Sequence, residues 1–309
     1  MEQKTKTWLL IDGHNMAFRC FYGVPQMTTT YGLHVNAIYG WVRSLWKLED
    51  VVRPNAVCVF FDSGGSTARK NILSTYKANR KVMPEELKQQ LEYMNLLSVA
   101  HGHYITVKEG IEADDLLASF SEKLNKYGET AYIASGDKDF AQCVGERTFQ
   151  MLPPTAQSKG TWRILDRYGI KENFGVFPEQ IVDYLSLLGD SSDNISGIEG
   201  IGSKRAEKFL NQFGNIDNLL QNLDKISSEK IRKNLSSSLE IIKRNRELIT
   251  LQKTTEFTIP TTTISRSPED IFTLLQNLQL NSLLALARRR YKLPDQVELF
   301  DDTPSQKKK

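Results

Sequence analysis

The sequence predicts an α/β core with a mostly parallel sheet flanked by helices, followed by a largely helical half. Three short apolar runs are separated by helix-length segments, as buried parallel strands are; they are TWLLID (7–12), AVCVFFD (56–62) and TAYIASGD (130–137). After about residue 175 helical patterns replace these runs, in VDYLSLLGD, in GIEGIGSKRAEKFL and in a long helix near 228–250. A final helical pair is expected near 268–289.

Each predicted strand ends in an aspartate: Asp12, Asp62 and Asp137. Residues just past the carboxyl ends of parallel strands converge on one edge of the sheet, where ligands bind. We therefore expect these three side chains to meet in space, although they are far apart in the sequence.

Further acids stand at predicted element ends. The segment GIEADDLLASFSEKL has apolar residues at helical spacing, and its first turn holds Glu112, Asp114 and Asp115. SGDKDF adds Asp139 beside Asp137, and LGDSSDN adds Asp190 and Asp193. For any one of them, capping of a helix is a sufficient explanation.

The acids as a group favour a metal site. Several carboxylates on one sheet edge would repel one another and titrate upward without cations. Oxygen ligands of this kind select Mg²⁺ or Mn²⁺, and two such ions about 3.5 to 4 Å apart can support phosphodiester hydrolysis. The four scattered histidines lack the spacing of zinc ligands. No Ser-His-Asp or Cys-His arrangement competes with this interpretation.

Composition points to a soluble, intracellular, cytoplasmic protein. The 309 residues are 40% apolar and 25% charged, with no apolar run near the roughly 18 residues of a membrane span. The three cysteines are predicted to be reduced core residues.

The net charge of +3 is weak, but the basic residues are clustered along the sequence. This clustering predicts separate positive tracks on the surface beside one negative pit. The clusters are Arg69, Lys70, Lys77, Arg80, Lys81 and Lys88, then Lys204, Arg205 and Lys208, then Arg288 to Arg290.

An ordered set of motifs resembles the bacterial and phage 5′ nuclease (flap endonuclease) family, including the amino-terminal 5′→3′ exonuclease domain of bacterial DNA polymerase I. The motifs run from about residue 7 to 291 and are LLIDGHNMAFRCF, VFFDSGG, YKANR, GIEADDLLAS, SGDKDF and LGDSSDNISGIEGIGSKRA. The resemblance implies a PIN-like catalytic domain over 1–175 with a helical arch about 63–100. It also implies a helical DNA-binding region over 176–291 with a helix-hairpin-helix about 185–214, and leaves 292–309 as a polar tail. No segment remains for a polymerase, so a free-standing nuclease is expected.

The resemblance also implies an activity and a ligand set. The expected enzyme is a metal-dependent 5′→3′ exonuclease and structure-specific flap endonuclease. It would act on DNA with 5′ flaps, nicks or ends, in primer or flap removal during replication and repair, using two Mg²⁺ ions for which Mn²⁺ can substitute. The first metal site corresponds to Asp12, Asp62, Glu112 and Asp114, with Asp115 beside them, and the second to Asp137, Asp139, Asp190 and Asp193.

Basic residues of the arch are the next implied group. By resemblance Arg69, Lys77 and Arg80 belong to the arch, with Lys77 against the scissile phosphate, and Arg19 lies near the reacting phosphate. A Lys and Arg cluster with Tyr76 interleaved would supply phosphate contacts and one stacking surface. The alternative for this stretch is a solvated surface helix.

The segment GIEGIGSKRA is a glycine-rich hairpin leading into a helix. Gly197, Gly200 and Gly202 would let the backbone approach a phosphate, and the next helix start would face the anion. The resemblance implies a helix-hairpin-helix that grips duplex DNA, often with K⁺ held by backbone carbonyls. An ordinary turn between helices is the alternative, and Lys204 and Arg205 favour DNA.

The tail contains QVELF (296–300), which resembles the pentapeptide by which bacterial replication and repair proteins bind the sliding clamp. Gln296, Leu299 and Phe300 would be its anchors. The alternative is that Leu299 and Phe300 pack on the core of the protein.

Two other functions fit the same sequence. A non-catalytic junction-binding protein could share the fold, although the filled acidic positions argue against it. An RNA-cleaving nuclease of the wider PIN-like group would keep the acids but would not need a helix-hairpin-helix.

Overall fold

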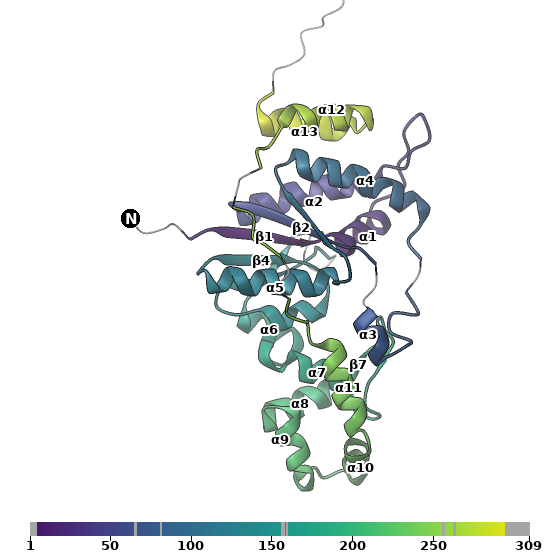
Figure 1. Cartoon of the computed structure of the whole chain (residues 1–309), viewed down its shortest axis with the longest axis vertical. Coiled ribbons are helices and arrows are strands. Elements are labelled where there is room, and N and C mark those ends of the chain that lie inside the picture. Colours follow the sequence, from purple (N-terminus) through teal and green to yellow (C-terminus); the bar gives the residue numbers. More distant parts are fainter. Residues whose placement is uncertain are drawn as a thin grey trace, which may run out of the picture.

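The computed structural model describes residues 5–64, 67–80, 82–155, 158, 160–254, 257–261 and 264–293. The first half of the chain is built on a six-stranded sheet with the order β3-β2-β1-β4-β5-β6 (Figure 1). All neighbours pair in parallel except β5 and β6, which are antiparallel. The strands are β1 (Thr7–Asp12), β2 (Ala56–Asp62), β3 (Tyr104–Lys108), β4 (Thr130–Ala134), β5 (Thr148–Leu152) and β6 (Arg163–Leu165).

This sheet confirms the predicted fold class and contains all three predicted strands. Sequence analysis did not anticipate β3, β5 and β6, which lie toward the two edges of the sheet. These strands are short, and their residues are not continuously apolar. A buried-strand pattern therefore does not develop in them.

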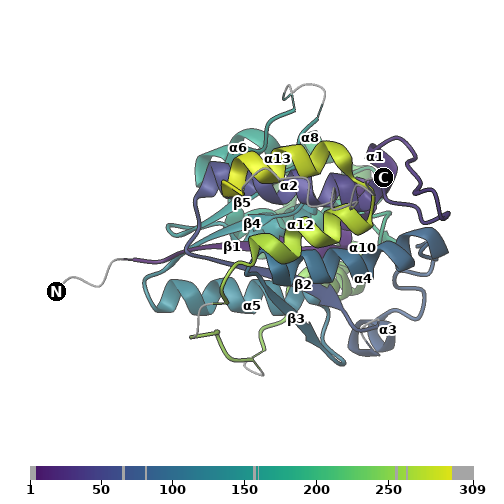
Figure 2. The same ribbon diagram turned by 90° about the horizontal axis from the view of Figure 1, so that it is seen from above.

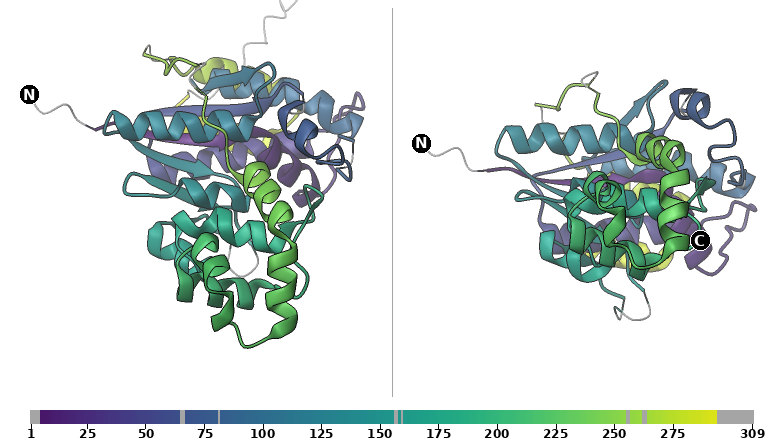
Figure 3. Two further views of the ribbon diagram at one scale, coloured as in Figure 1. Left: turned by 60° about the horizontal axis from the view of Figure 1, so that its bottom comes forward. Right: turned by 90° about the horizontal axis from the view of Figure 1, so that it is seen from below.

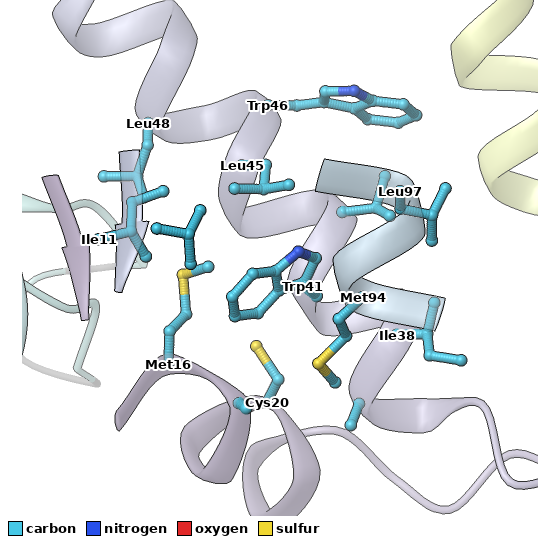
Figure 4. Close-up of a cluster of buried hydrophobic side chains, with 14 of the residues drawn as sticks. Ile11, Met16, Cys20, Ile38, Trp41, Leu45, Trp46, Leu48, Met94 and Leu97 are labelled. Atoms are coloured by element: carbon cyan, nitrogen blue, oxygen red, sulfur yellow. The ribbon is translucent and has the colours of Figure 1, made fainter. Parts of the chain in front are cut away.

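One face of the sheet is covered by α1 (Gly13–Gly23), α2 (Asn36–Val52) and α4 (Glu85–Ala100). Strand β1 alternates, so that Leu9 and Ile11 face these helices. In Figure 4 the Trp41 ring lies in the middle of this core, among side chains from α1, α2 and α4. The terminal pair α12 (Pro268–Asn277) and α13 (Asn281–Tyr291) lies over the same layer (Figure 2).

The opposite face of the sheet packs against α5 (Ala113–Lys126). Trp8 and Leu10 of β1 point to this side and meet Phe120 of α5. The helical half has a separate core beyond this layer (Figure 3). Its elements are η1 (Lys138–Cys143), α6 (Arg167–Phe174), η2 (Pro178–Gln180), α7 (Ile181–Leu188), β7 (Gly189–Asp190), β8 (Ile195–Ser196), α8 (Ser203–Phe213), α9 (Ile216–Gln221), η3 (Leu223–Lys225), α10 (Glu229–Ser237) and α11 (Leu239–Ile249).

The segment expected as an arch divides into two parts. Its first part holds the short helix α3 (Thr67–Ile72) and a turn-rich stretch. Its second part is α4, whose Leu87, Met94 and Leu97 are fully buried against the core. The helix expected near 228–250 is likewise two helices, α10 and α11, separated at Ser238.

Within the described part of the chain, no helix combines the length and apolar character needed to cross a membrane.

Candidate metal centre

The predicted meeting of the strand-end aspartates occurs where the sheet order reverses. The chain runs from β1 to β2 and β3 on one side of the sheet and then returns to β4 on the other side of β1. Such a switch point opens a crevice at the carboxyl ends of the strands. Asp12 closes β1, Asp62 closes β2 and Asp137 follows β4, and the charges of Asp62 and Asp137 both act on Asp12.

Asp12 is buried and also starts helix α1. Its carboxylate accepts hydrogen bonds from the Asn15 backbone N–H at 3.1 Å and from Ser135 Oγ at 2.7 Å. Burial raises the pKa of Asp12 to about 6, and the nearby charges of Asp137 and Asp62 add to that rise despite the two hydrogen bonds. The two hydrogen bonds hold the Asp12 side chain in place, but they do not offset the unfavourable free energy of its negative charge.

Asp62 is better stabilised than Asp12. It accepts from the Ala113 backbone N–H at 2.7 Å, and His14 Nδ1 lies 3.3 Å from its Oδ2. Burial alone would raise the pKa of Asp62, but His14 and the Ala113 amide outweigh it and hold the pKa below its ordinary value. Asp62 therefore joins the start of α5 to the sheet edge.

Helix α5 brings two further acids to this edge. Glu112 is the N-cap of the helix, one residue before its first turn, and Asp114 follows within that turn. Lys77 Nζ lies 3.0 Å from Glu112 Oε1 and 3.9 Å from Asp114 Oδ2. Burial raises the pKa of Asp114 well above its ordinary value, as do the charges of Asp12 and Asp137. We call Asp12, Asp62, Glu112 and Asp114 the first acidic group.

Asp115 has a different environment from Asp114. Both of its carboxylate oxygens accept from Arg69, at 2.8 and 2.7 Å, and Oδ1 also accepts from the Gln252 backbone N–H at 2.7 Å. These contacts point the carboxylate toward α3 and the segment after α11. Sequence analysis put Asp115 beside the first site, and the structure gives it this buried ion pair.

The second acidic group comprises Asp137, Asp139, Asp190 and Asp193, and it draws on two segments about 50 residues apart in the sequence. Asp137 caps η1 and Asp139 lies inside it, whereas Asp190 and Asp193 come from β7 and the following turn. One carboxylate oxygen from each of Asp139, Asp190 and Asp193 lies within 4.8 Å of the others. Burial raises the pKa of Asp139 well above its ordinary value, and the charges of Asp137 and Asp190 raise it further.

Two cations stand against this second group. Lys138 Nζ lies 3.1 Å from Asp190, and Arg80 Nη2 lies 2.6 Å from Asp193. Burial would raise the pKa of Asp190, but hydrogen bonds from Ser192 and the charge of Lys138 lower it instead. The buried Oδ1 of Asp139 has no hydrogen-bond partner among the described residues.

The donors of both groups fit divalent cations. They are carboxylate oxygens, the ligands that Mg²⁺, Mn²⁺ and Ca²⁺ prefer. A buried carboxylate oxygen without a partner is costly unless a cation or water satisfies it, and Asp139 Oδ1 is such an atom. The raised pKa values of Asp12, Asp114 and Asp139 indicate the same lack of positive charge.

Lys77 reaches the acids from the turn that follows α3. Its backbone has φ +57°, an uncommon conformation for a residue with a side chain. Its N–H donates to the Asp193 carbonyl at 3.1 Å, and its Nζ contacts the first group. Lys77 thus contacts both acidic groups: its backbone N–H binds the second group, and its ammonium binds the first.

Tyr76 lies in a place that the sequence did not indicate. Its side chain is 5% exposed and packs in the core of the helical half, so its ring offers no open stacking surface. Lys77 Nζ lies 5.0 Å from the ring centroid. Burial of the apolar ring in this core is favourable. It fixes the residue that precedes Lys77 in the chain and places the ring beside the Lys77 ammonium.

Arg19 lies on α1, the helix that Asp12 caps. Its guanidinium donates to the Pro154 carbonyl, and its side chain is exposed. It lines a pocket of about 1030 Å³ that also includes Asn15 and Gly136, next to the acids, and Trp162 farther out.

The predicted hairpin lies between α7 and α8. Gly197 is needed for internal packing, because an added Cβ would lie 2.0 Å from the Leu188 carbonyl oxygen. Gly200 has φ +79°, which disfavours other residues. Gly202 caps α8 with open space around it, and exposed Lys204 and Arg205 follow in the first turn. Arg205 donates to the Gly200 carbonyl.

Three residues of the centre were not predicted as site residues: His14, Ser135 and Lys138. Each lies within two residues of a predicted acid in the sequence. Adjacency to the motifs was the only signal for them, since a lone His, Ser or Lys has no spacing pattern. The predicted clamp-binding residues Gln296, Leu299 and Phe300 lie outside the described residues.

Comparison with known proteins agrees with this architecture. The family described as "5'-3' exonuclease, N-terminal resolvase-like domain" matches residues 7–175. The family described as "5'-3' exonuclease, C-terminal SAM fold" matches residues 176–271.

Two relatives match the chain over very different shares of their own length. The 5'-3' exonuclease of Aquifex aeolicus is 31% identical over 298 residues, which cover 96% of this chain and 100% of that protein. DNA polymerase I of Bacillus subtilis is 30% identical over 282 residues, covering 90% of this chain but 32% of the polymerase. The chain thus spans about a third of the polymerases that it matches.

Solved structures share the fold at lower identity. The T5 D15 protein co-crystallized with metal ions has a TM-score of 0.63 and 21% identity, covering 94% of this chain and 100% of that one. The catalytic core of Rad2 in complex with DNA substrate has a TM-score of 0.60 and 15% identity, covering 94% of this chain and 93% of that one. With both family models matched in order and a relative of full length at 31% identity, the chain belongs to the 5′-3′ exonuclease family.

Proposed function

We propose that the chain is a divalent-metal-dependent 5′→3′ exonuclease and structure-specific flap endonuclease. It hydrolyses phosphodiester bonds near 5′ ends and junctions of DNA, in primer and flap removal during replication and repair. One observation carries the proposal: two adjoining acidic groups at the switch point of the sheet hold more buried negative charge than nearby cations balance. Family membership and the metal-bound and DNA-bound structural neighbours support it.

The first acidic group would hold one Mg²⁺ and the second group another, with Mn²⁺ as a substitute. Divalent ions held by these carboxylates would supply activation of water and stabilisation of the negative charge on the leaving oxygen. Asp115 is proposed as an orienting neighbour, because Arg69 occupies both of its oxygens.

Lys77, Arg80 and Arg19 would contact phosphate groups of the substrate. Lys77 Nζ already lies within 3.0 Å of Glu112, so a phosphate bound at the first group would be within its reach. Arg80 has a half-exposed side chain at the second group. Arg19 lines a neighbouring pocket with Asn15 and Gly136, where a strand leaving the centre would pass.

The hairpin Gly197–Gly202 and the start of α8 would hold duplex DNA without reading its sequence. A helix N-terminus with free N–H groups and adjacent Lys204 and Arg205 suits a backbone phosphate. A K⁺ ion held by hairpin carbonyls would strengthen this contact.

Gel assays on 5′-labelled flap, nicked and blunt DNA test the proposal. With Mg²⁺ we expect release of short 5′ products from the flap and nicked substrates, and no cleavage in EDTA. Binding without cleavage in either condition would make the chain a junction-binding protein. Preference for single-stranded RNA in a competition assay would make it an RNA nuclease.

We also propose that the tail segment Gln296–Phe300 docks on a bacterial sliding clamp. A short peptide with few apolar anchors binds modestly, yet tethering to a ring on DNA raises the local enzyme concentration. Replacing Leu299 and Phe300 by Ala should abolish clamp-stimulated cleavage and leave cleavage without clamp unchanged. Loss of stability in that variant would instead place the two side chains in the core.

A further inference from the structure

Arg69 is buried between three elements. It lies on α3 and is 3% exposed. Its Nη1 donates to Glu112 and Asp115, its Nη2 to Asp115 and the Thr250 carbonyl, and its Nε to the Leu248 carbonyl at 3.0 Å. A guanidinium has five N–H groups, and these five bonds use all of them. No N–H of Arg69 is left to bind a phosphate in this arrangement.

The carbonyls that Arg69 binds belong to the end of α11 and the residues after it. The Gln252 N–H of the same stretch donates to Asp115 at 2.7 Å. We call Leu248–Gln252 the strap. It connects the helical half to the start of α5 through Arg69 and Asp115.

The strap is fixed on its other side by Gln142. The Gln142 side chain donates to the Ile249 carbonyl at 3.1 Å and accepts from the Leu251 N–H at 3.1 Å. Gln142 belongs to η1, three residues after Asp139. One stretch of backbone therefore contacts α5, which carries two acids of the first group at its start, and η1, which carries two acids of the second.

We propose that Arg69 is a positioning residue for Glu112, which it holds against the strap, and that it does not touch the substrate. The inference rests on the proposed function, in which Glu112 holds a divalent ion. Glu112 has two bonded oxygens, one facing Lys77 and the other facing Arg69. Arg69 fixes the carboxylate plane through Oε2, so that Oε1, now bonded to Lys77, is the oxygen that the ion would take.

The charge and shape of arginine are both needed for this role. A planar guanidinium binds Asp115 through two parallel bonds and still reaches Glu112 and the strap, whereas a lysine ammonium has three donors and no fixed plane. Groups that orient a metal ligand change metal affinity by roughly 10- to 100-fold when replaced. A group that contacts the phosphate changes instead the rate at saturating metal.

The test is direct Mn²⁺ binding to the DNA-free full chain, measured by electron paramagnetic resonance or calorimetry, for wild type, Arg69→Lys and a matched control. Arg246→Lys is the control, because Arg246 also forks between two acids, Asp183 and Asp217, but within the helical half. We expect Arg69→Lys to weaken one Mn²⁺ ion about tenfold or more, with Arg246→Lys within twofold of wild type.

Cleavage provides the second measurement. In Arg69→Lys the Mg²⁺ concentration for half-maximal flap cleavage should rise by the same factor, and the single-turnover rate at saturating Mg²⁺ should return to within about threefold of wild type. Unchanged Mn²⁺ affinity with a reduced saturated rate would overturn the inference and place Arg69 on the phosphate. Equal effects of the two lysine variants would reduce Arg69 to a general structural role.

A second variant covers failure of Arg69→Lys to fold. Asp115→Asn keeps the side-chain volume and should weaken the same Mn²⁺ ion less than tenfold. No change in affinity would overturn the inference, as would a loss as large as that of Asp114→Asn, which would make Asp115 itself a ligand. If wild type binds Mn²⁺ but cuts no flap, the proposed function fails while the effect of Arg69 on Mn²⁺ still decides the inference.

Discussion

Buried carboxylates lie at both ends of the central sheet, and their surroundings differ. At the carboxyl ends of the strands, desolvation and neighbouring acids raise the pKa values of Asp12 and Asp114. At the amino ends, Glu49 lies in a pocket of about 640 Å³ beside the first residues of β1, β2 and β3. Burial would raise the pKa of Glu49 too, yet it is lowered to about 2.

The difference comes from the partners of Glu49. Its Oε1 accepts from Arg266 at 2.6 Å and lies 2.9 Å from His103 Nε2, and its Oε2 accepts from Arg290 at 3.0 Å. These partners come from the chain after α11, from the start of β3 and from α13. One acid thus anchors the terminal helices to α2.

The presence or absence of neutralising side chains separates structural acids from functional ones. Glu49 forms ion pairs with Arg266 and Arg290, so its negative charge is neutralised by side chains of the same chain. The two acidic groups have Lys77, Lys138 and Arg80 against them, and some of their carboxylates remain unmatched. Charge that the fold does not neutralise is charge that a ligand must neutralise.

The largest expected effect is on cleavage, from Asp62→Ala. Loss of a carboxylate of the first acidic group should lower the single-turnover rate on a 5′ flap by roughly 10³-fold or more, as for loss of a key electrostatic group. Flap affinity measured in Ca²⁺ should stay within a few-fold, because it comes mostly from phosphate contacts elsewhere. Glu146→Ala, at an exposed acid, is the control. Near-normal turnover in Asp62→Ala would mean that the acids at the carboxyl ends of the strands are not needed for cleavage.

Lys77→Ala should produce the next largest effect. If the ammonium stabilises charge on the reacting phosphate, the single-turnover rate should fall roughly 10²- to 10³-fold. Flap affinity should change much less, and Lys88→Ala, at an exposed residue of α4, should change neither. A fall in affinity alone would mean that Lys77 positions DNA and does not act on the bond.

Glu49→Gln should affect stability and leave the chemistry intact. Removing the shared anion leaves Arg266 and Arg290 facing each other, and because both partly reach solvent we expect a loss of about 2 to 3 kcal/mol in urea unfolding at pH 7. Asp50→Asn is the matched control, since Asp50 pairs with the same Arg290 at 2.8 Å but is mostly exposed. It should cost less than about 1 kcal/mol. A loss of cleavage by folded Glu49→Gln would contradict the assignment.

The same cluster predicts how stability depends on pH. The pKa of Glu49 is lowered, so its stabilisation is complete above its ordinary value of 4.5 and is lost as the pH falls from there toward about 2. His101 is buried and its pKa is lowered to about 3, so unfolding takes up a proton below about pH 6.5 and acid destabilises the fold again. The stability gap between wild type and Glu49→Gln should therefore shrink below pH 4.5 in urea titrations. A constant gap would show that Glu49 does not act through its charge.

Much of the centre could be predicted because it depends on strand ends. Asp12 and Asp62 follow apolar runs, and the geometry of parallel strands brings such positions together whatever the loops do. Glu112 and Asp114 were found in the same way, at the start of an amphipathic helix.

What the sequence could not show depends on contacts between distant segments. Arg69 is buried by the strap, about 180 residues later in the chain, and that contact turns an expected arch residue into an internal one. Tyr76 is buried by the helical half for the same reason. The strands β3 and β6 are short edges with no continuous apolar run, so local pattern was too weak to reveal them.

The smallest expected effect concerns basic residues, and it extends the comparison from acids to cations. Arg290 at the end of α13 is occupied by Glu49 and Asp50, whereas Lys204 at the start of α8 is exposed and has no ion-pair partner among the described residues. These helices lie at opposite ends of the molecule (Figure 1).

Lys204→Ala should weaken binding to flaps of any sequence about equally and flatten the slope of log affinity against log salt by about one. Arg289→Ala, at an exposed residue of α13, is the matched control and should leave the slope unchanged. An equal change in both variants would mean that DNA is attracted by overall charge, and that unpaired cations are not concentrated at the α8 end.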